Sequence, residues 1–247
     1  MIRAVTFDCW GTLLLDSPGS DEQGYRRQRL AGIEAVLTAW GLTVSPRDLD
    51  RAYTAAGQRL ARIWQDRRDV PVSRHVTALL RALDPELPGR LDAATMEELV
   101  DAYSRPALRV PPASDGGAAA VLGELAGRGC ALGVVSNIMR TPGEALKAIL
   151  DRSGLLAPFK VLTFSDECGI RKPDPEIFLL TLRQFGVPPE DAIHVGDDPV
   201  LDVEGARDAG MRVIQVTPTG RATGPVKPDA VVTGLGELPA ALGRLGW

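Results

Sequence analysis

The feature that most constrains the fold is an alternation of short apolar runs with helical segments. Buried strands are predicted at six runs rich in apolar and β-branched residues, namely residues 3–8, 131–136, 160–164, 191–196, 212–216 and 230–233. Helices are predicted between them, with acid–proline starts at residues 174–175 and 198–199 and a capping-box pattern at residues 141–144. Strands that alternate with helices in this way form βαβ units. We therefore expect an α/β fold with a doubly wound, Rossmann-like parallel sheet.

Residues from about 16 to 105 break this alternation. None of their segments has a strand pattern, and four amphipathic helices are predicted instead, at residues 22–40, 47–66, 73–83 and 93–104. A helical insert placed directly after the first strand is expected to form a separate lobe. We therefore assign residues 1–15 and 106–247 to an α/β core domain and residues 16–105 to an all-helical cap domain.

The composition limits the classes of partner. The chain of 247 residues has a formal net charge of −4, which gives no general electrostatic reason to bind nucleic acid or an anionic membrane. Its apolar stretches are far shorter than the roughly 20 residues that a membrane-spanning helix needs. Three scattered cysteines make no disulfide framework. We expect a cytoplasmic monomer or homodimer with no nucleic acid or membrane as partner.

Polar side chains follow four of the predicted strands, at the edge where open α/β sheets bind ligands. They are Asp8 and Thr12 after the first strand, Ser136 and Asn137 after the second, Lys172 after the third, and Asp197, Asp198 and Asp202 after the fourth. The chain has only two histidines, so a metal here would be held by oxygen atoms, which favours Mg²⁺. Carboxylates grouped with one lysine suit Mg²⁺ and a phosphoryl group.

These residues form four motifs in order along the chain. They are DCWGT at residues 8–12, Ser136, Lys172, and GDD at residues 196–198 followed by Asp202. In this order the chain resembles, over its whole length, the haloacid dehalogenase (HAD) superfamily of hydrolases. It is similar to the subfamily whose helical (C1) cap is inserted between the first and second motifs.

The resemblance implies how the central residues act. Asp8 would be the nucleophile, forming an aspartyl ester or aspartyl phosphate that water later hydrolyses. Mg²⁺ would be held by Asp8, the backbone carbonyl of Trp10 and Asp197. Lys172 would act with Mg²⁺ to neutralise the repulsion between the carboxylate and an anionic substrate.

The resemblance also implies supporting roles. Thr12, Ser136 and Asn137 would bind the oxygens of the substrate, although Ser136 and Asn137 could also be turn or cap residues. Asp202 would orient Lys172 or a metal-bound water. Asp198 would stand beside the metal ligands, and its place directly before a proline favours a helix N-cap over direct metal ligation.

Trp10 departs from the phosphatase pattern. In HAD phosphatases this position is usually a second aspartate, which protonates the leaving group and then activates water. General acid–base help of this kind contributes about 10²–10⁴-fold, so a phosphatase without it should have low activity. We also expect His194, inside a strand, to be a core residue, and Arg26 and Arg27 to be candidate contacts for an anionic substrate or simply solvated.

We predict the first of three functions and keep the other two as alternatives. An Mg²⁺-dependent phosphohydrolase of a small phosphorylated metabolite agrees with the acids at residues 197 and 198. A 2-haloacid dehalogenase agrees with the aromatic Trp10, because those enzymes carry a tyrosine there and halide leaves without a proton. A vestigial or binding protein is the third, although Asp8, Lys172 and Asp197 are all present. The phosphonoacetaldehyde hydrolases need a cap lysine and are excluded, because no lysine occurs before residue 147.

Overall fold

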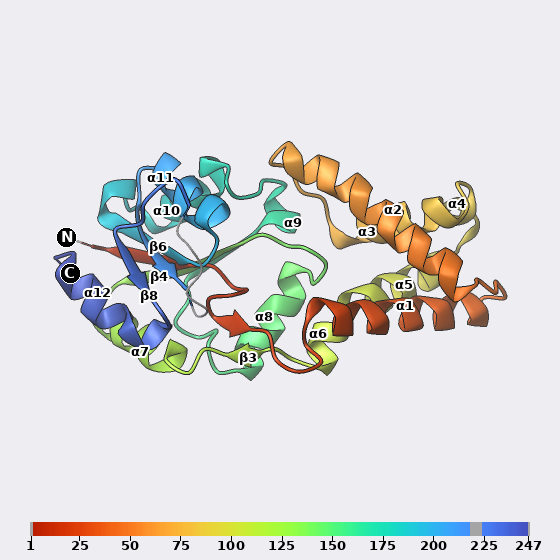
Figure 1. The fold of residues 1–247 in the computed structure, drawn as a ribbon, viewed down its shortest axis with the longest axis horizontal. Coiled ribbons are helices and arrows are strands. Elements are labelled where there is room, and N and C mark those ends of the chain that lie inside the picture. Colours follow the sequence, from red (N-terminus) through yellow and green to blue (C-terminus); the bar gives the residue numbers. More distant parts are fainter. Residues whose placement is uncertain (1, 218–223, 247) are drawn as a thin grey trace.

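The computed structural model describes residues 2–217 and 224–246 and has two lobes. Figure 1 shows an α/β lobe that contains both ends of the chain and an elongated helical lobe beside it. The helical lobe is inserted after the first strand of the sheet, as the sequence predicts. No helix within the described ranges is long and apolar enough to cross a membrane. The cytoplasmic location and the oligomeric state stay predictions.

The α/β lobe is built on a six-stranded sheet with the order β5-β4-β1-β6-β7-β8, in which every neighbouring pair is parallel. Its strands are β1 (Ala4–Phe7), β4 (Ala131–Ser136), β5 (Val161–Phe164), β6 (Ala192–Gly196), β7 (Arg212–Val216) and β8 (Ala230–Val232). All six predicted strands are confirmed to within one residue at each end. The strand order reverses around β1, so its carboxyl end lies at the topological switch point where such sheets bind ligands.

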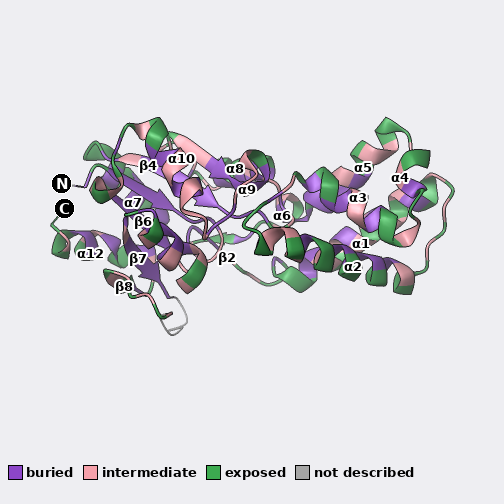
Figure 2. Ribbon diagram, turned by 90° about the horizontal axis from the view of Figure 1, so that it is seen from above, coloured by how far each residue is buried: buried purple, intermediate pink, exposed green. Residues whose placement is uncertain are grey.

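Both faces of the sheet are covered by helices, as a doubly wound fold requires. Alternate residues of β1 belong to different apolar clusters, with Val5 and Phe7 in one and Ala4 in the other. The first cluster includes residues of α7 (Ala118–Gly127), α8 (Gly143–Arg152) and α12 (Leu238–Arg244), and the second those of α10 (Pro175–Phe185) and α11 (Gly205–Asp208). Figure 2 shows this burial concentrated along the sheet.

Two of the three predicted helix starts are confirmed, and the capping box is wrong. Asp174 and Asp198 each accept hydrogen bonds from backbone N–H groups at the start of their helices. The helix after Asp198 begins as a π-helical segment, Pro199–Glu204, before α11. In α8, Pro142 occupies the N-cap and makes no side-chain cap bond, so the hydroxyl of Thr141 is available to accept a bond from Arg29 of the helical lobe.

Four long helices and one short one form the helical lobe, and a second short helix follows directly after it, where the chain re-enters the core. They are α1 (Glu22–Ala39), α2 (Pro46–Gln65), α3 (Val72–Leu83), α4 (Leu87–Arg90), α5 (Ala93–Ser104) and α6 (Pro106–Arg109). The four long helices confirm the prediction, and α4 forms where a turn is expected. Asp21, Ser45 and Asp92 cap the N-termini of α1, α2 and α5. Residues 16–105, all of which the structure describes, contain no strand.

The connection between the lobes has two features that the sequence did not predict. The chain leaves the core through β2 (Leu14–Leu15) and returns through β3 (Ala113–Ser114), and these two short strands of the core pair antiparallel. A contact between the lobes joins the loop after α2 to the loop after α9 (Ser165–Cys168), where Asp69 accepts from Arg171 at 2.6 Å. This buried ion pair ties the helical lobe to the residue immediately before Lys172.

Candidate active site

The candidate active site forms where the carboxyl ends of β1, β4 and β6 meet. Asp8 follows β1 directly, and its backbone N–H continues the ladder to the carbonyl of Val195 in β6 at 2.9 Å. Its side chain is buried and points to the lysine that follows β5. Lys172 donates from Nζ to Oδ1 of Asp8 and to Oδ1 of Asp202, both at 2.6 Å. The topology thus brings together residues that are far apart in the sequence.

Asn137 fixes the backbone of Lys172. Its amide Nδ2 donates to the carbonyl of Lys172 at 3.0 Å, and its Oδ1 accepts from the backbone N–H of Lys172 at 2.8 Å. The peptide bond from Lys172 to Pro173 is cis. Asn137 is a predicted substrate contact, but the structure uses both ends of its amide to hold the lysine loop. Asn137 thus positions Lys172, and its contact with substrate stays a prediction.

Asp202 is held on both of its oxygens. Oδ1 accepts from Lys172 and lies 3.0 Å from Nε2 of His194, whose Nδ1 lies 2.9 Å from the hydroxyl of Thr6. Oδ2 accepts from the backbone N–H of Asp198 at 2.9 Å. His194 is fully buried, as predicted, but it is also part of this chain of hydrogen bonds. No local pattern in the sequence signals this contact, beyond a histidine on a strand that ends in the site.

The carboxylate of Asp198 faces its own helix. Its Oδ1 accepts from the backbone N–H groups of Val200 and Leu201, both at 2.8 Å. The preference for a helix N-cap over direct metal ligation therefore agrees with the structure. Asp198 still supports the site, because its backbone N–H binds Asp202.

The charges in this buried cluster shift one another's pKa values. Burial outweighs the favourable charge of Lys172 and raises the pKa of Asp8. The pKa of Asp202 is lowered despite burial, because Lys172 and His194 both stabilise its anion. Asp202 and Asp8 in turn outweigh the effect of burial on Lys172 and raise the pKa of the lysine. Lys172 is therefore a permanent cation between two acids.

Asp197 is the acid that this lysine leaves uncompensated. Burial, followed by the charges of Asp8 and Asp202, raises the pKa of Asp197 to about 7. Ligand oxygens of these three acids lie within 4.8 Å of one another. Among the described residues, no lysine or arginine nitrogen lies within ion-pair distance of Asp197. The arrangement has room for one further positive charge.

Gly11 makes the approach of Asp197 possible. Its φ is +76°, in the left-handed region that favours glycine, and a Cβ on it would lie 2.6 Å from Cγ of Asp197. Position 11 therefore needs glycine for two reasons: its backbone conformation is strained for other residues, and a side chain there would collide with Asp197.

Thr12 and Ser136 present hydroxyls that nothing in the described structure satisfies. Both side chains are buried, and neither Oγ has a hydrogen-bond partner. Buried polar groups are nearly always paired in folded proteins, so these two hydroxyls at one sheet edge are donors still free to bind a further polar group. Their placement fits the predicted role of binding substrate oxygens.

Trp10 lies between this cluster and the helical lobe. Its ring is half-buried and meets the ring of Tyr25 in α1 edge-on, with centroids 6.4 Å apart. It lines a cavity of about 200 Å³ between the lobes. The cavity wall is made of Trp10, Asp16, Ser20, Glu22, Tyr25, Arg29, Met139, Arg140 and Thr141. The tryptophan is therefore both a packing residue and a wall of the space next to the nucleophile loop.

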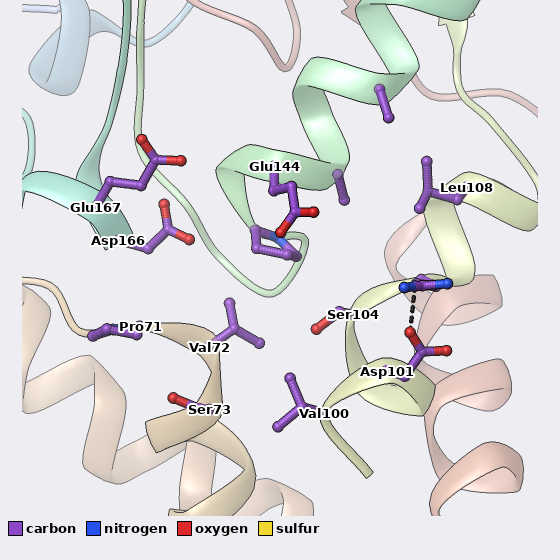
Figure 3. A pocket seen from close by; sticks show the side chains of 14 residues that line it. Pro71, Val72, Ser73, Val100, Asp101, Ser104, Leu108, Glu144, Asp166 and Glu167 are labelled. Atoms are coloured by element: carbon purple, nitrogen blue, oxygen red, sulfur yellow. Dashed lines mark ion pairs between the residues drawn. The ribbon is translucent and has the colours of Figure 1, made fainter. Parts of the chain in front are cut away.

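A larger cavity of about 600 Å³ also opens between the lobes, and Figure 3 shows its lining. It is formed by α3, α5 and α6 on one side and by α8 and α9 on the other. Asp166 in its wall has its pKa raised to about 6 by burial. None of the predicted site residues lines this cavity, whereas Trp10 of the first motif lines the smaller one.

A parallel sheet with a strand-end aspartate, a buried lysine bridging two acids and a helical insert defines a hydrolase of the HAD type. The chain belongs to the haloacid dehalogenase-like hydrolase family, whose sequence profile matches residues 2–210. The RAVTFDCWGT segment and the three later motifs all lie within this match.

Several relatives are phosphatases. A glyceraldehyde 3-phosphate phosphatase of Methanopyrus kandleri is 31% identical over 224 residues, which is 87% of this chain and 84% of that protein. A phosphoserine phosphatase of Thermus thermophilus is 39% identical over 142 residues, but the match spans only 57% of this chain and 55% of that enzyme. A phosphoglycolate phosphatase of Escherichia coli O157:H7 is 27% identical over 98% of this chain and 93% of its own.

Solved structures confirm the fold. A 2-haloacid dehalogenase from Pseudomonas syringae pv. Tomato DC3000 superposes with a TM-score of 0.68 at 26% identity, over 99% of this chain and 100% of its own. A HAD phosphatase from Thermococcus onnurineus gives a TM-score of 0.64, also at 26% identity, over 98% of each chain. The chain is thus a HAD-like hydrolase, and phosphatases predominate among the relatives named here.

Proposed function

We propose that the protein is an Mg²⁺-dependent phosphohydrolase that acts on a small phosphorylated metabolite through an aspartyl phosphate on Asp8. The observation that carries this proposal is Asp197, a buried acid with a pKa raised to about 7 beside two other carboxylates. Such a cluster is electrostatically costly unless a cation completes it. A dehalogenase has no need of that third acid.

The donor set fits Mg²⁺. Asp8, Asp197 and the backbone carbonyl of Trp10 would hold the ion, since Mg²⁺ prefers carboxylate and carbonyl oxygens. The raised pKa of Asp197 and the absence of a lysine or arginine partner among the described residues support this assignment. When bound, Mg²⁺ would draw negative charge from the phosphoryl group and reduce its repulsion by Asp8.

The protein's own residues then account for the two chemical steps. A carboxylate oxygen of Asp8 attacks phosphorus, the bond from phosphorus to the leaving oxygen breaks, and that oxygen departs with the bonding electrons. Thr12 and Ser136 donate to the phosphoryl oxygens, which satisfies their buried hydroxyls. Water then attacks the acyl phosphate, loses a proton, and releases inorganic phosphate with Asp8 restored. Lys172 holds Asp8 in position and offsets its charge throughout.

Trp10 limits this chemistry at the leaving group. An indole ring has no acidic proton to give to a departing alkoxide and cannot act as a base toward water. We therefore propose low activity, with a preference for substrates whose leaving oxygen is already a weak base. The same tryptophan would shield the nucleophile loop from solvent through its contact with Tyr25.

The helical lobe, residues 16–105, would act as the cap domain over the site of the core, residues 1–15 and 106–247. The support is its placement: α1 supplies Tyr25 and Arg29 to the cavity beside Trp10. The Asp69–Arg171 ion pair would set how closely this lobe sits above Lys172.

The second candidate is a 2-haloacid dehalogenase in which Asp8 attacks carbon. The aromatic ring of Trp10 favours it, as does the structural likeness to the Pseudomonas syringae dehalogenase. Against it stands Asp197, whose charge would repel the carboxylate of a haloacid.

One assay separates these functions. Release of phosphate from p-nitrophenyl phosphate and of chloride from 2-chloropropionate is measured with MgCl₂ and with EDTA, for the wild type and for Asp8→Asn. We expect phosphate release that requires both Mg²⁺ and Asp8. Chloride release that is independent of metal would overturn the proposal in favour of the dehalogenase. Turnover of neither substrate would favour a vestigial or binding protein.

A further inference from the structure

Arg29 is a buried cation without a carboxylate partner. It lies on the inner side of α1 with only 2% of its surface exposed, and it is among the largest fully enclosed side chains. None of the ion pairs of the described residues includes it. Arginine is almost never fully buried in proteins unless it is paired. An unpaired buried charge is one of the costliest features that a fold can carry.

The protein satisfies this guanidinium only in part. Nε donates to the carbonyl of Tyr103 at 3.0 Å, and Nη2 reaches the hydroxyl of Thr141 in the core at 3.4 Å. The guanidinium carbon lies 5.6 Å and 5.7 Å from the ring centroids of Tyr25 and Tyr103. These contacts fix the orientation of the guanidinium. Nη1 remains buried with no hydrogen-bond partner, and so does the hydroxyl of Tyr53, whose pKa the nearby guanidinium lowers against the larger effect of burial.

The cavity that Arg29 lines is the one beside the nucleophile loop. Trp10, two residues after Asp8, forms its wall on the core side, and Arg29 forms part of the wall on the helical side. Its volume of about 200 Å³ suits a small substituent rather than a large group. A substrate bound to Asp8 at its phosphoryl end would extend its other end past Trp10 into this space.

The carboxylates in the same wall do not pair with Arg29. Asp16 and Glu22 are both exposed, and Glu22 lies 3.2 Å from Arg140 of the core. Arg140 is thereby partly neutralised. Arg29 is left as a buried, oriented cation in the cavity wall, with Nη1 unpaired.

The two arginines that sequence reasoning favoured do not have these properties. Arg26 pairs with Asp50 at 2.7 Å and stacks over the ring of Tyr53. Arg27 is exposed. Arg29, one turn nearer the C-terminal end of α1, is the member of this helix whose donor is both buried and unpaired.

We propose that the substrate carries a second anionic group, a carboxylate or a second phosphate, and that Arg29 binds it between the lobes. This inference rests on the proposed phosphohydrolase function. A planar guanidinium with a fixed orientation recognises a two-oxygen anion better than a point charge does. Binding the distal group through the cap would also tie the helical lobe to the core only when such a substrate is present. Arg29 thus sets the substrate class.

The test compares substrates with similar alkyl leaving groups. Hydrolysis of ethyl phosphate, phosphoglycolate and ethylene glycol bisphosphate is measured for the wild type, Arg29→Lys and Arg29→Gln, with the exposed Arg27→Gln as control. We expect the wild type to favour at least one doubly anionic substrate over ethyl phosphate by about tenfold or more in kcat/KM. Whether phosphoglycolate or the bisphosphate is favoured identifies the second anion.

Arg29→Gln should remove most of that preference, chiefly through KM, while Arg27→Gln keeps it. Arg29→Lys should keep the charge but recover only part of the preference. Phosphoglycolate and the bisphosphate are also tested by thermal shift in the Asp8→Asn background, where Arg29→Gln should abolish the stabilisation. This readout needs no turnover.

Equal loss on all three substrates would show that Arg29 is only structural. A wild type that hydrolyses ethyl phosphate as well as the doubly anionic esters would also overturn the inference, even if the Arg29 variants fail to fold. In both cases Asp8-dependent release of phosphate would leave the proposed function standing. Loss of all phosphate release would instead reject the proposed function itself.

Discussion

Nε2 of His194 lies 3.0 Å from Oδ1 of Asp202, the same carboxylate oxygen that accepts the ammonium of Lys172. One acid therefore links a strand histidine to the lysine of the site. Burial lowers the pKa of His194, which keeps the ring neutral, and Thr6 binds its other nitrogen at 2.9 Å. Asp202 is thus the residue through which the hydrophobic core of the sheet fixes the position of Lys172.

We expect Asp202→Asn to destabilise the fold strongly and to impair catalysis. Removing one partner of a buried ion pair typically costs about 3–5 kcal/mol, and the loss here should lie toward the lower end because Lys172 keeps its contact with Asp8. The measurement is urea unfolding at pH 7. Arg183→Gln is the control, since its pair with Glu176 is exposed to solvent and should contribute little to stability.

The pH dependence checks this account of Asp202. The pKa of Asp202 is lowered in the folded state, so in acid the unfolded chain binds more protons than the folded one. The stability that Asp202 contributes is therefore lost as the pH falls below the ordinary pKa of an aspartate. The difference in unfolding free energy between the wild type and Asp202→Asn should therefore narrow below about pH 4. A difference that stays constant down to pH 3 would contradict it.

Ser136→Ala should separate binding from stability. The hydroxyl is buried without a partner, so its loss removes an unsatisfied polar group and should leave the unfolding free energy unchanged or slightly raised. The same change should lower kcat/KM for p-nitrophenyl phosphate by about tenfold or more, because one donor to the phosphoryl group is gone. Thr12→Val is a second variant of the same kind. A stability loss above about 1 kcal/mol would indicate a structural role instead.

The sequence predicted the sheet and the strand-end residues well, for a physical reason. Strands buried on both faces leave continuous apolar runs, and the polar residues after them must lie at one edge of a parallel sheet. Asp8, Lys172 and Asp202 accordingly come together as expected. Asp198 was recognisable as a helix cap because Pro199 follows it.

The missed features depend on long-range packing that leaves no local pattern. A buried arginine such as Arg29 has the same helical spacing as an exposed one, and only the docking of α1 on the core decides which is enclosed. The role of Asn137 depends on a loop 35 residues further along the chain. The capping box at residues 141–144 fails because Pro142 takes the cap position and Thr141 faces the other lobe.

Trp10→Asp tests whether a proton donor is the missing part of the phosphatase. If it is, hydrolysis of esters with poor leaving groups should rise by at least about tenfold, within the 10²–10⁴-fold that general acid–base catalysis provides. Hydrolysis of p-nitrophenyl phosphate should change less, because its leaving group needs little protonation. The measurement is kcat/KM for both kinds of ester, in parallel with Trp10→Ala.

The alanine variant is needed because Trp10 packs against Tyr25. Trp10→Ala removes the ring without adding an acid, so it reports the cost of lost packing alone. Equal changes in both variants would mean that the carboxylate contributes nothing and that Trp10 has a packing or substrate role.

Mg²⁺ binding should weaken in mild acid because of Asp197. Its pKa is raised from 3.8 to about 7, so between these values the folded state keeps a proton that the unfolded chain has lost. This protonation stabilises the fold, and the stabilisation fades as the pH rises through about 7. Mg²⁺ requires the ionised carboxylate, so the affinity for Mg²⁺ should fall about tenfold from pH 8 to pH 6, and the thermal stabilisation by Mg²⁺ should be larger at pH 8.

Calorimetric titration in buffers of different ionisation enthalpy measures both the affinity and the proton released. Asp197→Asn should lose the pH-dependent change in Mg²⁺ affinity. Asp198→Asn should keep it, because asparagine is also a good N-cap. An unchanged pH dependence in Asp197→Asn would show that the metal binds elsewhere.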